Sequence, residues 1–119
     1  MSWDWEKNLY SNPEKSGLKI VGQVDFSSGS YEFDYLVVWQ DVETGDTYYA
    51  SDSGCSCPSP FENLEREDLL PINRLQDLLE HVEYAKRERS YDSPQRISDD
   101  CIRLVNAWTE ATKQPAIAA

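Results

Sequence analysis

The first half of the chain alternates apolar and polar residues with a period of two, which is typical of half-buried β-strands. The first such run covers residues 18–26. Its apolar positions are expected to share one buried face: Leu18, Ile20, Val24 and Phe26, with Gly22 in the same row. The pattern therefore predicts a strand whose other face is polar.

Two further strands are expected downstream. Residues 32–41 alternate at first, but the second half of this run is apolar on both faces, as in a central strand. Residues 47–52 are rich in side chains that favour strands. The segment 42–46 between them, with Gly45 able to adopt a positive φ, is typical of a hairpin loop. Together the three strands predict an antiparallel meander.

In the second half of the chain the period changes to 3.6 residues, which predicts two amphipathic helices. One helix is expected over about 72–88, with Pro71 suited to its first turn. Residues 63–70 ahead of it, NLEREDLL, are expected to form a short separate helical turn. The second helix is expected over about 95–113.

These elements predict a single α+β domain over residues 1–119, with both helices packed on one face of the sheet. Residues 1–16 would form an N-terminal arm anchored by Trp3, Trp5, Leu9 and Tyr10, and residues 114–119 a flexible tail. The expected core combines the second strand with both helices: Phe33, Tyr35, Val37, Trp39, Leu75, Leu79, Val82, Leu104, Val105 and Trp108.

Composition narrows the class of protein. The 119 residues carry 22 acidic and 11 basic side chains, a net charge of -11, so direct binding to a nucleic-acid backbone is not expected. No apolar run is long enough for a transmembrane helix, and the N-terminus lacks the basic and apolar regions of a signal peptide. The three cysteines are therefore expected to be reduced thiols in a cytoplasm.

The segment SDSGCSCPSPFEN, residues 51–63, is the candidate binding or structural hallmark. Gly54 would relieve steric restriction where the third strand ends, and two prolines favour extended backbone conformations around them. The main interpretation is a stiff crossover from sheet to helices, with an aromatic ring buried at its far end. The residues of interest are Asp52, Gly54, Cys55, Cys57, Pro58, Pro60 and Phe61.

Two chemical alternatives stay open for the same segment. Cys55 and Cys57 could join His81 and Cys101 as a Cys₃His zinc site, although the spacing differs from zinc fingers and Cys101 lies on the apolar stripe of its helix. A catalytic cysteine would need His81, the single histidine, as its base. No phosphate-binding, dinucleotide or hydrolase motif is present, so neither an enzyme activity nor a cofactor is expected.

The first half of the chain contains three distinctive blocks: EKNLYSNPEKSGLKIVG, YEFDYLVVWQD and YYASDSGCSCPSPFE. They resemble the successive blocks of a small family of uncharacterised proteins found mainly in phages of actinobacteria and in related bacterial genomes. The resemblance covers residues 6 to about 63, and DSGCSCPSPFE is its most specific block. It implies a phage or prophage origin and a bacterial host cytoplasm, and no particular reaction.

The expected function is that of a small acidic accessory protein that binds another protein, with modulation or inhibition of a host protein as one form. Its partner would be a host or phage protein with a basic surface, and no membrane or direct nucleic-acid binding is expected. Two other classes remain open. One is a virion or assembly component that acts through oligomeric contacts, and the other is a small Cys/His metalloprotein or thiol enzyme.

Overall fold

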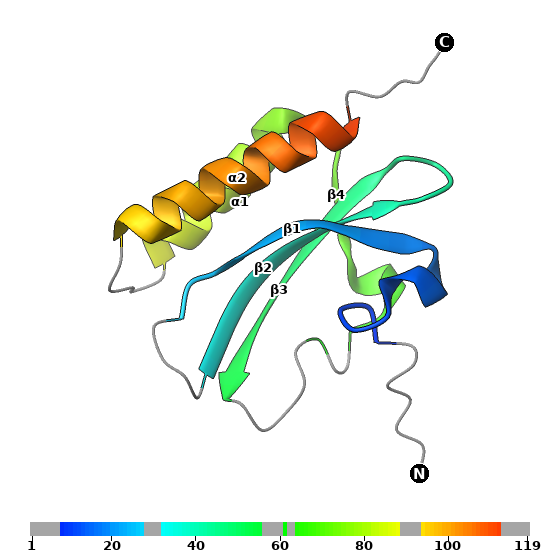
Figure 1. Cartoon of the computed structure of the whole chain (residues 1–119), viewed down its shortest axis with the longest axis horizontal. Helices are drawn as coiled ribbons and strands as arrows, with labels where there is room; N and C mark the ends of the chain where they lie inside the picture. The colour runs from blue at the N-terminus through cyan, green and yellow to red at the C-terminus, as the bar shows by residue number, and fades with distance from the viewer. Residues whose placement is uncertain (1–7, 28–31, 56–60, 62–63, 89–93, 113–119) are drawn as a thin grey trace.

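The structure is a computed structural model that describes residues 8–27, 32–55, 61, 64–88 and 94–112. Its elements, in which η marks a 3-10 helix, are η2 (Pro13–Ser16), β1 (Leu18–Asp25), β2 (Glu32–Asp41), β3 (Thr47–Cys55), η3 (Arg66–Asp68), β4 (Leu70–Ile72), α1 (Leu75–Glu88) and α2 (Pro94–Thr112). The strands form one antiparallel sheet in the order β1-β2-β3-β4. Both helices lie on the same face of this sheet (Figure 1), so the predicted α+β class and the placement of the helices are confirmed.

The sheet separates two groups of buried side chains. The helix-facing core joins α1 and α2 to one face, and its largest members are Phe26, Leu36, Ile72, Leu78, Ile97, Leu104 and Trp108. Residues 8–16 and η3 lie on the opposite side of the sheet (Figure 1), where the second core consists of Leu9, Leu18, Val37, Trp39, Ala50, Phe61 and Leu69. There Leu9 is 2% exposed and its C=O accepts the indole N–H of Trp39 at 3.0 Å. The described portion of the N-terminal arm is therefore anchored on the second face, as expected.

A register shift interrupts β1 between Ile20 and Gly22. Leu18 and Ile20, before the shift, pack on the face away from the helices, whereas Val24 and Phe26, after it, pack toward them. The expectation that these four side chains share one face is therefore wrong. One extra residue in a strand reverses the alternation beyond it, so both halves of β1 bury their apolar residues, but on different faces.

Backbone hydrogen bonds fix the direction in which each residue of the sheet points its polar groups. The N–H of Phe26 donates to the C=O of Asp34 at 2.8 Å, and the N–H of Asp41 donates to the C=O of Asp46 at 2.8 Å. Even-numbered residues of β2 therefore bond to β1 and odd-numbered residues to β3. Given the β2–β3 register, even-numbered residues of β3 bond to β2, and odd-numbered residues point toward the outer edge.

The fourth strand, β4, was not expected, and it contains Pro71, which the sequence pattern places in the first turn of the helix. Pro71 pairs with Tyr48, an even-numbered residue whose own polar groups face β2. A proline fits there because that position of the edge strand needs no N–H. The helix begins at Leu75 instead, where the carboxylate of Asp77 accepts the N–H groups of Asn73 and Arg74, each at 3.1 Å. The expected helical turn before it is confirmed as η3.

The expected core is correct except for two residues of α1, Leu75 and Leu79. Leu75 and Leu79 are each 41% exposed, because the sheet-facing stripe of this helix is formed by Leu78, Val82 and Ala85. At about 100° per residue, Leu75 and Leu79 lie roughly 60° and 100° around the helix from Leu78. The apolar arc of the sequence is thus wider than the surface that the sheet covers. The other expected core residues are buried or half-buried: Phe33, Tyr35, Val37, Trp39, Val82, Leu104, Val105 and Trp108.

Candidate functional site

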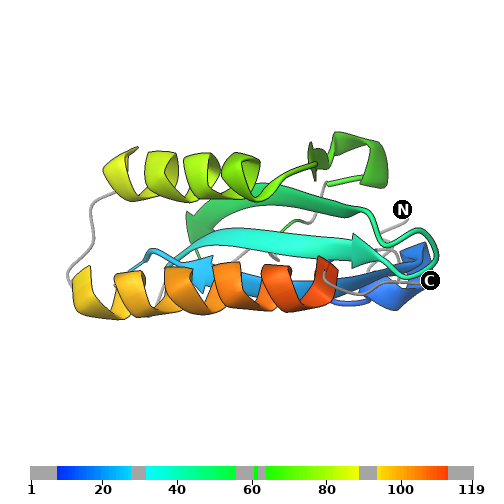
Figure 2. The same ribbon diagram turned by 90° about the horizontal axis from the view of Figure 1, so that it is seen from above.

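An open groove of about 870 Å³ lies between α1 and the outer edge of β3. Figure 2 shows α1 running along this side of the sheet, whereas α2 lies over β1. The groove is bounded by α1 on one side and by the segment that carries η3 and β4 on the other. Its lining includes Leu36, Tyr49, Ala50, Ser51, Leu64, Asp68, Leu70, Glu80, His81, Tyr84 and Arg87.

The edge of β3 inside this groove is unpaired in the described structure. β4 pairs with residues 47–49 of β3, and no described strand pairs with the outer edge over 50–55. Since odd-numbered residues point outward, Ser51 and Ser53 direct their backbone polar groups to this edge. The N–H of Ser53 donates to Oδ1 of Asp52 at 3.0 Å, as expected for a group outside the ladder. The N–H and C=O of Ser51 and the C=O of Ser53 thus point to the outer edge, and Ser51 lines the groove.

Aromatic and aliphatic side chains from α1, β3 and β4 line the groove on the helix-facing side of the sheet. The ring of His81 packs on the ring of Tyr49, with centroids 3.9 Å apart. Burial raises the pKa of Tyr49, with a smaller contribution from the carboxylate of Asp77, so its hydroxyl stays neutral at physiological pH. Tyr84 and Leu70 are 57% and 51% exposed. This side therefore presents a mixed aromatic and aliphatic surface to the solvent.

The opposite side of the groove is held by the short turn of η3. Leu64 packs against the second core, and the N–H of Glu65 donates to Oδ2 of Asp68 at 3.0 Å in a reciprocal capping box. Asp68 and Glu80 place two carboxylates on the lining, against the single guanidinium of Arg87. The rim of the groove is therefore more negative than positive.

Asp41 and Arg66 tie η3 to the body of the protein. The guanidinium of Arg66 pairs with the carboxylate of Asp41 and donates to the C=O of Ser16 at 2.6 Å. The carboxylate also accepts the N–H of Thr44 at 3.0 Å and that of Glu43 at 2.7 Å. The N–H of Thr44, the Arg66 guanidinium and the N–H of Glu43 together lower the pKa of Asp41 to about 2.

The Asp41→Asn variant is expected to be less stable than the wild type at pH 7, and the difference should shrink as the pH falls from about 4 toward 2. A depressed pKa stabilises the fold fully above the unfolded-state value of about 3.9, and that stabilisation is lost as the pH falls through the folded value. Urea unfolding at a series of pH values measures the difference. A difference that stays constant down to pH 2 would contradict this role for the carboxylate.

Phe61 is fixed at the end of the cysteine-containing segment. Its N–H donates to Oδ2 of Asp52 at 2.7 Å, and its C=O accepts Nδ2 of Asn8 at 3.3 Å. The side chain is 2% exposed and packs edge-on against Trp39, with ring centroids 5.4 Å apart. Its φ of 61° lies in the left-handed region that a bulky residue rarely adopts. The predicted burial of Phe61 is confirmed, and its bond to Asp52 ties the two ends of segment 53–60 together.

The remaining residues of this hallmark are placed only in part. Gly54 was expected near the end of the third strand, but β3 continues through it to Cys55, because these residues pair with the first residues of β2. Cys57, Pro58 and Pro60 lie outside the described residues, as does the side chain of Cys55. The stiff crossover therefore stays a prediction, as do the metal and thiol alternatives that involve these cysteines.

The other two candidate metal ligands occupy different environments. His81 lines the groove, whereas Cys101 is 4% exposed and belongs to the helix-facing core. Burial raises the pKa of the Cys101 thiol, which keeps it protonated and unreactive at neutral pH. Across residues 8–27, 32–55, 61, 64–88 and 94–112, no group of three His, Cys, Asp or Glu side chains could hold a metal ion.

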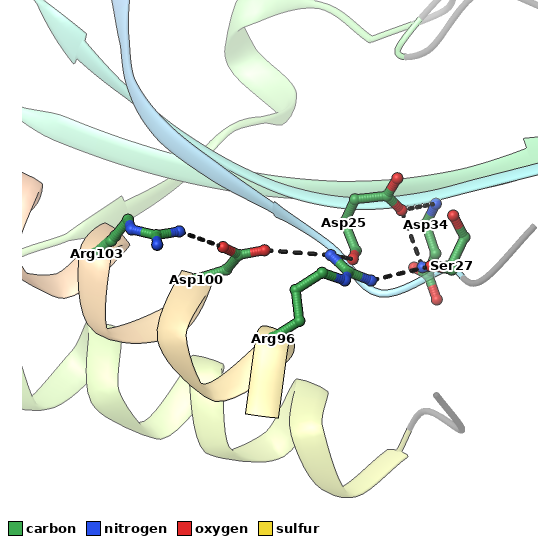
Figure 3. Close-up of polar contacts among 6 residues, drawn as sticks. All are labelled: Asp25, Ser27, Asp34, Arg96, Asp100 and Arg103. Atoms are coloured by element: carbon green, nitrogen blue, oxygen red, sulfur yellow. Dashed lines mark hydrogen bonds and ion pairs between the residues drawn. The ribbon is translucent and has the colours of Figure 1, made fainter. Parts of the chain in front are cut away.

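A polar network at the other edge of the sheet anchors α2 (Figure 3). The guanidinium of Arg96 donates to the C=O groups of Asp25 and Ser27, each at 3.3 Å, and pairs with Asp100 at 3.2 Å. Arg103 pairs with the same carboxylate at 2.8 Å. Since the residue between Asp25 and Ser27 bonds to β2, these two carbonyls point outward from β1. The network therefore covers this end of the β1 edge.

The sequence pattern did not single out Ser51, Leu70 or Tyr84 as candidate binding residues. Tyr84 carries the clearest signal, because an aromatic residue lies there on the polar side of the predicted helix. Leu70 is exposed only because β4 forms an edge strand, and Ser51 matters only because β4 is shorter than β3. Neither property is visible without the pairing of the strands.

Comparison with known proteins gives a family and no activity. No helix in the described portion of the chain is long and apolar enough to cross a bilayer. No curated protein and no solved structure matches the chain. One family model matches residues 7–112, which cover both cores and the groove. The chain therefore belongs to the family described as Domain of unknown function (DUF7574).

Proposed function

We propose that this protein is a small acidic accessory protein that acts by binding another protein in the groove between α1 and the edge of β3. The observation that carries the proposal is that one open groove combines exposed apolar side chains, Leu70 and Tyr84, with a stretch of strand edge that pairs with no other described strand. Protein interfaces are enriched in tyrosine and carry few charges at their centres. Apolar side chains gathered beside a polar rim commonly mark a binding site.

Charge supports a partner with a basic surface. The chain has a net charge of -11, and the groove is lined by Asp68 and Glu80 against one arginine, Arg87. A negative electrostatic potential attracts lysine and arginine side chains and speeds the diffusional encounter with a basic partner. It also repels nucleic-acid phosphates and other acidic proteins.

The proposal includes an origin and a place of action. We assign the protein to a phage or prophage of an actinobacterium, where it would act without catalysis in the bacterial cytoplasm and modulate or inhibit a host protein. The support for this origin is the resemblance of the sequence blocks within residues 6–63. The competing class, an assembly component, would instead use the same surface to bind further copies of this chain.

Replacing the exposed apolar residues of the groove is expected to weaken partner binding without unfolding the protein. Leu70→Ser and Tyr84→Ser should each weaken binding by about tenfold or more, as for residues central to an interface. Val42→Ser and Ile102→Ser are matched controls, because these residues are 59% and 58% exposed but lie outside the groove. The measurement is quantitative capture from an actinobacterial lysate, followed by titration of the captured protein.

The same experiment includes two decisive readouts. A captured protein that binds the groove variants as tightly as the controls would contradict the assignment of the site. Once a partner is purified, its association rate should fall as salt rises, because the Debye length shrinks from about 8 Å at physiological salt to about 3 Å at 1 M. An association rate that does not respond to salt would remove the basic partner from the proposal.

A further inference from the structure

The groove suggests how the partner is recognised, in an inference that rests on the proposed function. We propose that its occupant is an extended segment of the partner protein, which adds to the outer edge of β3 as a further strand. The segment carries apolar residues at alternate positions with lysine or arginine between them. Strand addition to an exposed sheet edge is a recurring mode of peptide recognition, in which backbone bonds supply affinity and side-chain pockets supply specificity.

The edge of β3 offers the hydrogen-bonding groups that such a strand requires. The N–H and C=O of Ser51 and the C=O of Ser53 point outward. β4 already pairs with residues 47–49 of the same edge. An added strand would therefore continue the line of β4, at the usual spacing of about 4.8 Å from β3.

The lining of the groove comes from both faces of the sheet. On the helix-facing side of the sheet, the lining comes from Tyr49, His81 and Tyr84, and on the opposite side it comes from Leu64 and Asp68. Successive side chains of a strand point to opposite faces, so an added strand would meet these two surfaces in turn. Apolar residues would pack against the aromatic surface, and basic residues would approach the carboxylate of Asp68. This arrangement explains why the bound segment is expected to alternate apolar and basic residues.

The two edges of the sheet differ in how far they are protected, and the difference favours the β3 edge as the site of strand addition. Natural sheets protect exposed edges with bulges, charged side chains or covering groups. The β1 edge has a register shift after Ile20, and Arg96 donates to two of its outward carbonyls. On the described β3 edge beyond Tyr49, the carboxylate of Asp52 accepts the outward N–H of Ser53, whereas no described group bonds to the outward N–H and C=O of Ser51. Ser51 lies in the groove, whose lining combines apolar and charged side chains.

The charge of the chain argues for a different protein as the occupant rather than a second copy. Pairing two copies edge to edge would bring together two molecules that each carry a net charge of -11. A basic segment of another protein would instead bring positive charge into a groove that carries the carboxylates of Asp68 and Glu80. We therefore assign the site to a basic, extended segment.

Ser51→Pro and Ser51→Ala form the pair of variants that tests strand addition. Proline removes the outward N–H of residue 51 and leaves the ladder to β2 intact, because residue 51 does not bond to β2. Alanine keeps the N–H and serves as the control. The probe is a phage-displayed library of random 12-residue peptides selected on the wild-type protein. Selected peptides should alternate apolar and basic residues, bind Ser51→Ala within about twofold, and bind Ser51→Pro at least tenfold more weakly.

Hydrogen exchange on the wild-type protein gives a second test that does not depend on the proline variant folding. A bound peptide should slow exchange of the Ser51 amide, which points outward in the free protein, and leave exchange of the Val42 amide unchanged, since that N–H already donates to the C=O of Gly17 at 3.0 Å. Exchange at Ser51 that is the same with and without saturating peptide would overturn strand addition.

The outcomes separate this inference from the proposed function. Peptides that lose affinity for Tyr84→Ser but bind Ser51→Pro and Ser51→Ala equally would overturn strand addition and leave the groove as the binding site. If Tyr84→Ser changes the affinity of neither the peptides nor the captured proteins, the proposed function would be overturned as well. A dimer detected by light scattering that Ser51→Pro converts to a monomer would assign the edge to a second copy and overturn the basic segment.

Discussion

The Phe61→Ala variant is expected to lower the free energy of unfolding by about 3–5 kcal/mol, the range for removing a buried aromatic ring. Phe61 is 2% exposed, and its ring fills the space beside Trp39 and Tyr10 on the face of the sheet that the helices do not cover. Alanine would leave a cavity there. It would also remove the burial that compensates for the left-handed backbone at residue 61.

Urea unfolding followed by circular dichroism measures this loss. Tyr84→Ala is the matched control, because Tyr84 is 57% exposed and should change stability by no more than about 0.5 kcal/mol. A loss below about 1 kcal/mol for Phe61→Ala would show that the second core does not depend on this ring. The segment between Asp52 and Phe61 would then need another explanation than its anchoring by a buried side chain.

The Trp108→Ala variant is expected to cost a similar amount, about 3–5 kcal/mol. Trp108 is 8% exposed, and its indole N–H donates to Oγ1 of Thr47 at 2.8 Å. The same hydroxyl donates to the C=O of Ile72 at 3.1 Å. This relay links α2, β3 and β4, so the variant loses both the packing of the indole and a buried hydrogen bond.

Two further variants separate these contributions. Trp108→Phe keeps most of the ring packing and should lose less, with about 0.5–1.5 kcal/mol attributable to the hydrogen bond. Ile102→Ala on the same helix is the control, because Ile102 is 58% exposed. If Trp108→Ala behaved like Ile102→Ala, the helix-facing core would have to be packed differently around Thr47.

The hydrogen-bond relay from Trp108 through Thr47 to Ile72 also supports one wall of the groove. Thr47 and Ile72 form the first pair between β3 and β4, and Leu70, two residues before Ile72, lines the groove. Loosening this pair should therefore disturb the position of Leu70 as well as global stability. Binding experiments with core variants would report on folding, so the exposed variants of the groove are the sounder test of binding.

Local pattern in the sequence determined much of the fold. The apolar residues on both faces in the second half of residues 32–41 predicted a central strand, and β2 lies between β1 and β3. Gly45 was expected to allow a positive φ in the hairpin loop, and its φ is 83°. The two helices and the burial of Phe61 were also predictable. These features depend on short-range properties, namely side-chain periodicity and backbone freedom, which a single sequence displays directly.

Only the tertiary structure decided the features that depend on contacts between distant parts of the chain. The register shift in β1 depends on its pairing with β2, and β4 exists because Leu70–Ile72 meets the edge of β3. The exposure of Leu79 depends on which arc of α1 the sheet covers. Each of these features is set by a partner distant in the sequence, and the residues themselves are compatible with more than one arrangement. For the same reason, the unpaired edge at Ser51 could be recognised only once the lengths of β3 and β4 were compared in space.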